Sequence, residues 1–197
     1  MNPDHVDLGP AASHLAELVR NVAESDLTAR TPCPDYRVGD LLDHIDGLAL
    51  AFTWAATKDA VDLPDAAPSG DAARLGHDWR TRIPAALDAL AAAWRDPDAW
   101  TGMTKAGGIE LPGEVCGLVA LDELVVHGWD LAVATGQPFH VDERSLEAVA
   151  AFAASFSGPG TEDQRDGAFG PEVPVPADAP LLDRVLGMLG RDPRWSP

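Results

Sequence analysis

Lysine is nearly absent from this sequence, whose 197 residues include Lys58, Lys105 and no other lysine. Lys and Arg together number 14 against 32 Asp and Glu, which gives a formal net charge of −18 at pH 7. A surface with this charge repels phosphate backbones, and no basic cluster offsets it, so we expect no nucleic-acid partner. The charge favours solubility and does not by itself indicate a function.

Long apolar runs and cysteine are scarce as well. No stretch of about 18 apolar residues occurs, so we expect no transmembrane helix and no membrane partner. The first residues, MNPDHVDLGP, have neither the basic start nor the apolar core of a signal peptide. Two cysteines, Cys33 and Cys116, are too few and too far apart for a disulfide framework or a metal finger. The sequence therefore predicts a cytoplasmic protein in a reducing compartment.

Helical patterns occupy most of the remaining sequence. Apolar residues recur at helical spacing in four long segments, about 5–28, 38–58, 71–95 and from after Pro112 to near Gly136. Pro84 falls inside the third segment and should kink or split that helix. The length suits one domain over residues 1–197 rather than two. Four long helices predict an all-α protein, an up-down four-helix bundle with its core at about 5–136.

The segments around this core are less regular. Residues 96–113 break the helical rhythm, and Gly107–Gly108 between apolar residues predicts a short β-hairpin or an extended loop there. Beyond the bundle we expect a C-terminal extension, about 137–197, with helices at about 142–157 and 178–190 and an irregular Gly/Pro-rich segment between them.

The most informative stretch is the apolar helix over residues 118–135, LVALDELVVHGWDLAVAT. Glu123 and His127 stand four residues apart on it, so their side chains share one face. A carboxylate and an imidazole in an apolar helix cost free energy unless something satisfies them. A divalent metal would do so, with His44 at the border of the buried stripe of 38–58 as the third ligand. Two nitrogens and one carboxylate oxygen suit zinc, and nickel, iron or manganese less exclusively.

Each proposed ligand also has a simpler interpretation. A single buried histidine is more often a core residue than a ligand, and Asp40 with His44 repeats the same four-residue spacing by chance. Asp130, three residues after His127, either orients that imidazole or is an exposed helix acid. The sequence alone leaves these alternatives open.

The sequence also leaves the roles of several other side chains undecided. Cys33, between two prolines, is either a small buried hydrophobe or a residue that lines the site. Trp54 and Trp129 can line a pocket, although we favour a place in the core for both. His14 is expected to be partly exposed, and nothing decides whether His77 faces solvent or the site.

Two stretches carry a resemblance to a known family: residues 31–48, TPCPDYRVGDLLDHIDGL, and 121–137, LDELVVHGWDLAVATGQ. Together they resemble the DinB-like superfamily of metal-binding bundles and, more narrowly, the mycothiol-dependent maleylpyruvate isomerase N-terminal domain family. The segment GPEVPVPADAPLLDRVLGMLGRDPRW also looks like actinobacterial members, in keeping with few lysines and abundant alanine and arginine. The resemblance implies a DinB-like bundle and a divalent metal, usually zinc, held by His44, Glu123 and His127.

The same resemblance implies a chemistry. A low-molecular-weight thiol, mycothiol in actinobacteria, would bind the metal, and coordination to a cation deprotonates a thiol whose ordinary pKa is about 8.5. The thiolate would add to a small electrophile, as in an S-transferase, or isomerise a cis double bond by addition and elimination. Isomerases of this family carry a further C-terminal domain, whereas about sixty residues follow the metal helix here. We therefore expect thiol chemistry without a defined substrate.

Two other functions remain compatible with the sequence. One is a non-catalytic metal-binding bundle with a stress, storage or interaction role. The other is a metal-dependent hydrolase whose bound water is the nucleophile. A metal with an open coordination position favours an enzyme, whereas a closed site with four protein ligands favours a structural role. The sequence does not decide the metal, the substrate or the choice between monomer and homodimer.

Overall fold

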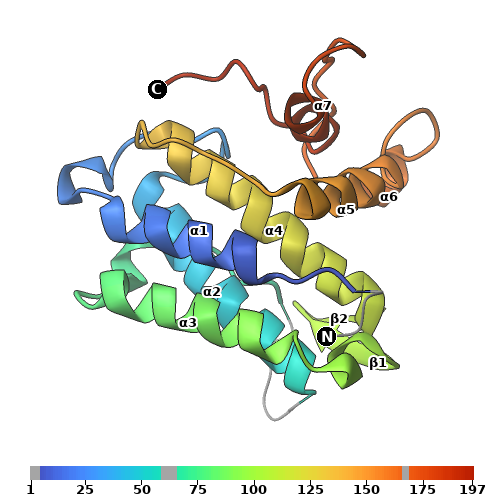
Figure 1. Ribbon diagram of the computed structural model, residues 1–197. Coiled ribbons are helices and arrows are strands. Elements are labelled where there is room, and N and C mark those ends of the chain that lie inside the picture. The colour runs from blue at the N-terminus through green and yellow to red at the C-terminus, as the bar shows by residue number, and fades with distance from the viewer. Residues whose placement is uncertain (1–4, 59–65, 166–168) are drawn as a thin grey trace.

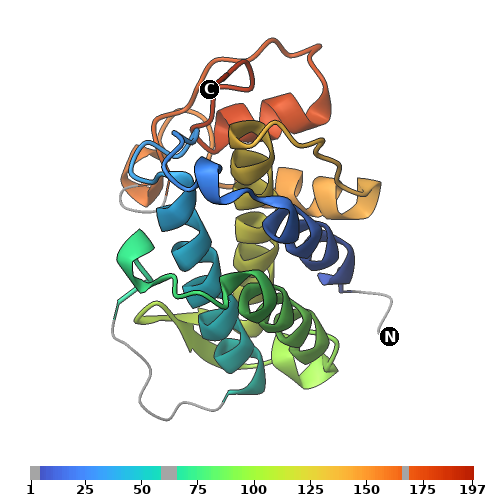
Figure 2. The ribbon, with the colours of Figure 1, turned by 90° about the vertical axis from the view of Figure 1, so that its left-hand side faces the viewer.

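The computed structural model describes residues 5–58, 66–165 and 169–197, and it is mostly helical (Figure 1). Four helices are long: α1 (Gly9–Asn21), α2 (Val38–Thr57), α3 (Trp79–Ala93) and α4 (Gly113–Ala134). Both α1 and α2 pack against α3 and α4, so α1 lies diagonally opposite α2. Figure 2 shows α2 and α4 side by side. The predicted all-α four-helix bundle is confirmed.

Helix α1 is shorter than the 5–28 predicted from its apolar pattern. The backbone N–H of Gly9 donates to Asp7 Oδ1 at 2.9 Å, which marks the start of the helix. Helix α1 ends at Asn21 because Val22 adopts an extended conformation, and a single 3₁₀ turn, η1 (Glu24–Asp26), follows. His14 of this helix is buried rather than partly exposed, since its Nε2 accepts a hydrogen bond from the backbone N–H of His140 at 3.3 Å.

Helix α2 agrees closely with the prediction of 38–58. Its N-terminus is capped where Asp40 Oδ2 accepts the backbone N–H of Arg37 at 3.0 Å. Leu41, Leu42 and other apolar residues of this helix are fully buried in the core. The helix ends at Thr57, because Lys58 after it has a left-handed backbone (φ 58°) that cannot continue a right-handed helix.

Helix α3 begins later than the predicted 71. Residues Ala72–Arg74 form a separate 3₁₀ turn, η2, and Gly76 at φ +71° redirects the chain before the helix starts. Pro84 does not split helix α3. It lies buried inside one continuous helix. The missing N–H removes one hydrogen bond, and packing against α1 and α2 holds the helix across that gap.

The predicted hairpin is present between α3 and α4. After a short 3₁₀ helix, η3 (Pro97–Trp100), strands β1 (Met103–Ala106) and β2 (Ile109–Pro112) pair antiparallel. Gly107 and Gly108 both have positive φ (55° and 83°), as a two-residue type I′ turn requires. Thr104 Oγ1 donates to Ala55 O at 2.6 Å, which fastens the hairpin to α2.

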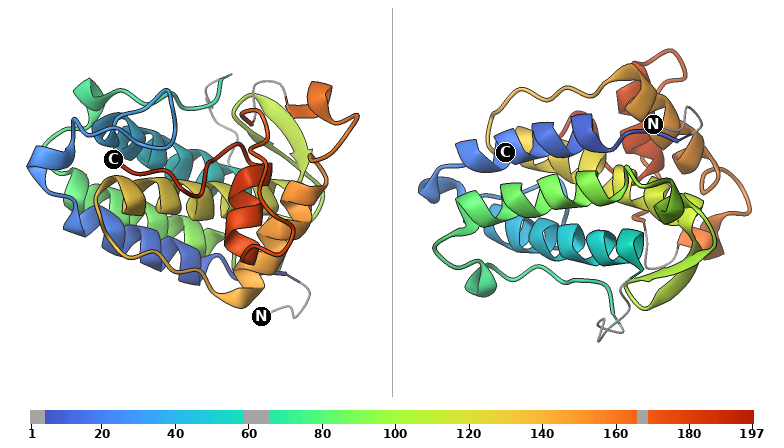
Figure 3. Two further views of the ribbon diagram at one scale, coloured as in Figure 1. Left: turned by 90° about the horizontal axis from the view of Figure 1, so that it is seen from above. Right: turned by 60° about the horizontal axis from the view of Figure 1, so that its bottom comes forward.

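The C-terminal extension covers one side of α4 (Figure 3). It contains α5 (Glu143–Ala154), α7 (Leu181–Met188) and, not expected from the sequence, the four-residue helix α6 (Glu162–Arg165). Helix α5 packs on α4, and α7 packs on α5. After α7 the chain returns to α4, where Arg191 contacts Asp130. None of the helices in the described ranges is both long and apolar enough to cross a membrane.

Candidate metal centre

The bundle brings His44 of α2 together with Glu123 and His127 of α4. One possible ligand atom from each residue lies within 4.8 Å of the other two. His127 Nε2 and Glu123 Oε2 are 2.9 Å apart, as their four-residue spacing on a helix allows. The imidazoles of His44 and His127 meet edge to face with ring centres 5.0 Å apart. The three residues predicted from the sequence thus converge on one point.

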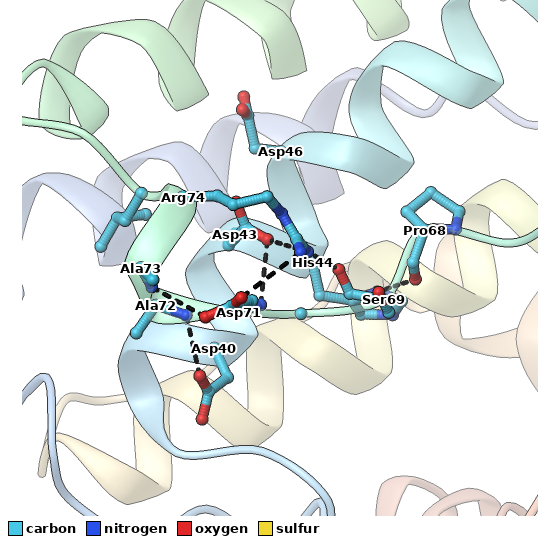
Figure 4. Close-up of polar contacts among 12 residues, drawn as sticks. Asp40, Asp43, His44, Asp46, Pro68, Ser69, Asp71, Ala72, Ala73 and Arg74 are labelled. Atoms are coloured by element: carbon cyan, nitrogen blue, oxygen red, sulfur yellow. Dashed lines mark hydrogen bonds and ion pairs between the residues drawn. The ribbon is translucent and has the colours of Figure 1, made fainter. Parts of the chain in front are cut away.

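His44 is oriented by a loop that folds back on α2. Its Nδ1 donates to Pro68 O at 2.7 Å, which leaves Nε2 as the nitrogen with a free lone pair. The loop itself is fixed to α2 (Figure 4): the carboxylates of Asp40 and Asp43 accept two of its backbone N–H groups at 2.8 and 3.0 Å. The imidazole therefore has a defined tautomer before any ligand arrives.

His127 is oriented by a buried carboxylate. Its Nδ1 lies 3.0 Å from Asp130 Oδ2, and Asp130 has no exposed surface. Arg191 donates from Nε to Asp130 Oδ1 and from Nη2 to Asp130 Oδ2, both at 3.0 Å. The interpretation of Asp130 as an exposed helix acid is therefore wrong, because the C-terminal extension covers that face of α4. A carboxylate behind a ligand histidine is the usual support of a metal site.

The surroundings move the pKa values of the two histidines in opposite directions. Burial, together with the nearby charge of His127, lowers the pKa of His44 to about 4. Burial alone would lower the pKa of His127 too, but hydrogen bonds to Asp130 and Glu123 outweigh it and raise that pKa to about 9. Burial would raise the pKa of Glu123, and the hydrogen bond to His127 reverses the direction, so its pKa is lowered. His44 is thus neutral at pH 7 and has a lone pair to offer.

These residues fit a divalent metal. Zinc binds nitrogen and oxygen ligands at about 2.0–2.2 Å, which places tetrahedral ligands about 3.4 Å from one another. The donor atoms of His44, Glu123 and His127 lie within 4.8 Å of one another, and Glu123 Oε2 and His127 Nε2 are 2.9 Å apart, so their separations lie close to that spacing. Three protein ligands leave a further position, and the Glu123 side chain, 30% exposed, marks the open side. His127 on the inner side is only 7% exposed.

Two further residues, Tyr36 and Cys33, lie near the centre without joining the donor cluster. Tyr36 lies with its ring 5.0 Å from that of His44, and its hydroxyl accepts the backbone N–H of Gly70 at 3.2 Å. Cys33 is buried, and burial raises the pKa of its thiol, while the nearby charge of Arg191 acts in the opposite direction. Cys33 is therefore a buried thiol next to the supporting ion pair rather than a ligand.

The remaining candidates lie elsewhere. Trp129 is buried in α4, as predicted, whereas the core position predicted for Trp54 is wrong because that side chain is 38% exposed. His77 is exposed and takes no part in the cluster. Sequence reasoning missed Pro68 and Arg191, which act on the site from distant segments and carry no local motif.

A family model described as the mycothiol maleylpyruvate isomerase N-terminal domain matches residues 8–132. The chain belongs to this family. The matched range runs from the start of α1 through nearly all of α4 and includes His44, Glu123 and His127. Arg191 and the rest of the extension follow the matched range, so the support of Asp130 comes from outside the family domain.

Similar proteins agree with this membership in the mycothiol maleylpyruvate isomerase N-terminal domain family. Two uncharacterized proteins of Mycobacterium tuberculosis, from strains CDC 1551 and H37Rv, are each 31% identical over 196 residues, covering 93% of this chain and 95% of each relative. The crystal structure of the mycothiol-dependent maleylpyruvate isomerase has a TM-score of 0.50 at 18% identity, over 77% of this chain and 70% of that one. At that identity the likeness shows a common fold, the DinB-like bundle.

Proposed function

We propose that this protein is a divalent-metal-dependent thiol transferase that delivers a low-molecular-weight thiol, mycothiol in the first instance, to a small electrophile. The observation that carries the proposal is the convergence of His44, Glu123 and His127, whose donor atoms lie within 4.8 Å and leave one side open. Zinc suits this donor set best, and nickel is the second choice. Family membership supports mycothiol as the thiol, and isomerisation by addition and elimination is a variant of the same chemistry.

Each residue has a defined part in this proposal. A divalent cation held by His44, Glu123 and His127 lowers the pKa of a coordinated thiol and so supplies a thiolate at neutral pH. Pro68 O and Asp130 fix the two imidazoles so that each Nε2 faces the site. Glu123 is the single anion of the donor set, and Arg191 balances the charge of Asp130, which lies behind His127. This low negative charge favours an anionic further ligand such as a thiolate.

A fluorogenic thiol assay tests the proposal. The metal-loaded protein is incubated with mycothiol and monochlorobimane, and the rate is compared with that of His127→Ala and of His77→Ala, an exposed histidine outside the cluster. We expect wild type and His77→Ala to accelerate the reaction equally and His127→Ala to match the protein-free rate. Equal rates for wild type and His127→Ala would reject the transferase function.

A second function is favoured by one specific observation. A cavity that reaches Glu123 from the apolar bundle core measures about 10 Å³, room for about one water molecule, and is lined by neither His44 nor His127. This agrees with a non-catalytic metal-binding bundle, which needs a metal but no substrate. Stoichiometric metal that His44→Ala loses, combined with no thiol transfer above background for any electrophile, would select this function instead.

A further inference from the structure

A larger cavity lies beside the metal centre, on the outer side of α2. It measures about 370 Å³, is partly open to solvent and is lined by α2, residues 66–69 and the hairpin residues 105–108. Cavities that bind small molecules start at about 300 Å³, so this one has room for a small ligand. The α2 wall is formed by residues at helical spacing, Gly47, Leu50, Ala51 and Trp54.

We propose that this cavity binds the flat, apolar body of a small aromatic or unsaturated electrophile. The assignment of that ligand as an electrophile rests on the proposed thiol-transferase function. Leu50 is 44% exposed and Trp54 38%, although both are large apolar residues one helical turn apart on the same wall. Exposed apolar side chains grouped around a concavity mark a binding surface. The indole of Trp54 offers a flat face on which a planar ligand stacks.

The cavity and the metal centre share a structural part, Pro68. Its carbonyl accepts the hydrogen bond that orients His44, and the same residue lines the cavity. Gly47, three residues after His44, lies about 4.5 Å further along the helix axis. A side chain at Gly47 would place its Cβ 2.6 Å from Pro68 Cβ, so glycine is what allows the loop to lie this close. The near end of the cavity, at Gly47, therefore lies about one helical turn from His44, whereas its far end, at Trp54, lies about 15 Å from His44 along the helix axis.

The side chains that line the cavity limit the kinds of molecule that it can bind. Apart from Ser69 and Lys105, the lining is Gly, Ala, Pro, Leu and Trp. Sugars and nucleotides require many hydrogen-bond partners, because a polar group buried without one costs about 1–3 kcal/mol. Two polar side chains cannot supply them. A compact, mostly apolar molecule with at most one or two polar substituents matches the cavity.

Binding can be tested without any turnover. The probe is 2,4-dinitrotoluene, an unreactive analogue of the electrophile 1-chloro-2,4-dinitrobenzene whose nitroaromatic ring quenches tryptophan fluorescence. We expect saturable binding to metal-free and metal-loaded protein alike. Ala51→Phe fills the cavity and should raise the dissociation constant of the probe by about tenfold or more. A tenfold rise corresponds to about 1.4 kcal/mol of binding free energy. Ala89→Phe, the same change at an exposed alanine of α3, should bind as wild type.

A second variant covers the case in which Ala51→Phe does not fold. Trp54→Ala changes a partly exposed side chain and should also lower the affinity for the probe by about tenfold. Absence of saturable binding to wild type, or equal affinity for wild type and both cavity variants, would overturn the assignment whatever the thiol assay gives.

Turnover separates this inference from the proposed function. With mycothiol and 1-chloro-2,4-dinitrobenzene, a sulfur–carbon bond forms, the carbon–chlorine bond breaks and chloride leaves with its electron pair, while the thiol proton passes to solvent. We expect Trp54→Ala to raise KM for the electrophile with little change in kcat, since the metal centre is untouched. Probe binding without any turnover would support the cavity and reject the transferase function.

Discussion

Asp130 and Arg191 are 61 residues apart in the sequence and form a buried pair behind the candidate metal centre. The guanidinium donates to both carboxylate oxygens at 3.0 Å, and Asp130 in turn contacts His127 Nδ1 at 3.0 Å. The C-terminal extension thus reaches a proposed metal ligand through one intermediate residue. This arrangement makes the segment after α7 part of the support of the site.

Removing this guanidinium should weaken both the fold and the site. In Arg191→Ala the carboxylate of Asp130 stays buried without its cation, which costs about 3–5 kcal/mol of unfolding free energy. Loss of such support at a ligand histidine lowers metal affinity by about 10–100-fold. Denaturant unfolding and competition with a chromogenic chelator measure the two effects. Arg194→Ala, which breaks the exposed pair with Asp192, is the matched control and should change neither. Unaltered metal affinity in Arg191→Ala would contradict the supporting role.

Metal binding should release a proton from His127. At pH 7 this imidazole is protonated, because its pKa is about 9, whereas His44 with a pKa of about 4 is already neutral. A ligand imidazole must be neutral, so about one proton leaves for each ion bound. Affinity should then rise about tenfold for each pH unit up to about 9 and level off above it. Calorimetric titrations in two buffers of different ionisation enthalpy count the protons, and a count near zero would contradict the pairing described for His127.

The metal-free protein should lose stability as the pH rises from 6.5 to 9. The folded-state pKa of His127, about 9, exceeds the unfolded value of 6.5, so its contribution is full below 6.5 and is lost on passing 9. The difference corresponds to at most about 3 kcal/mol. His44 acts the other way: its lowered pKa contributes stability above 6.5 that is lost as the pH falls towards 4. Urea unfolding at pH 6.5 and 9.5 checks the first effect, which His127→Gln should abolish.

Helix α4 packs closely against the rings of Trp94 and Trp100 at Gly117. A Cβ added there would lie 2.5 Å from the ring of Trp100 and 2.9 Å from that of Trp94. Alanine favours the helix by about 1 kcal/mol over glycine, but overpacking a core costs about 1–3 kcal/mol and should outweigh it. We expect Gly117→Ala to lower the thermal midpoint while the folded protein keeps its metal affinity. Higher stability in this variant would show that the two indoles move aside.

Much of the site was predictable because its parts obey local rules. Glu123 and His127 share a face through their four-residue spacing, and both that helix and α2 have clear apolar patterns. The Gly107–Gly108 turn was predictable for the same reason, since positive φ at two successive residues is easy only for glycine. Residues whose role is set by their own helix or turn were therefore found.

The residues that were missed depend on tertiary contacts. Arg191 has no motif that marks a partner 61 residues away, and without it the sequence could not decide whether Asp130 orients His127 or is an exposed acid. Trp54 was expected in the core because aromatic residues usually lie there, whereas here it lines a cavity formed by distant segments. The end of α1 and the start of α3 were misplaced because Val22 and Gly76 redirect the backbone within continuous apolar patterns.

Elemental analysis of the purified protein, with His44→Ala and His127→Ala beside it, addresses the metal centre most directly. Each variant removes one of the three converging donors, and His77→Ala removes an exposed imidazole as a control. We predict about one divalent ion per chain, zinc in the first instance, for wild type and His77→Ala and a large loss in both ligand variants. A wild-type protein that takes up no stoichiometric metal, or ligand variants that retain it fully, would contradict the assignment of His44, Glu123 and His127.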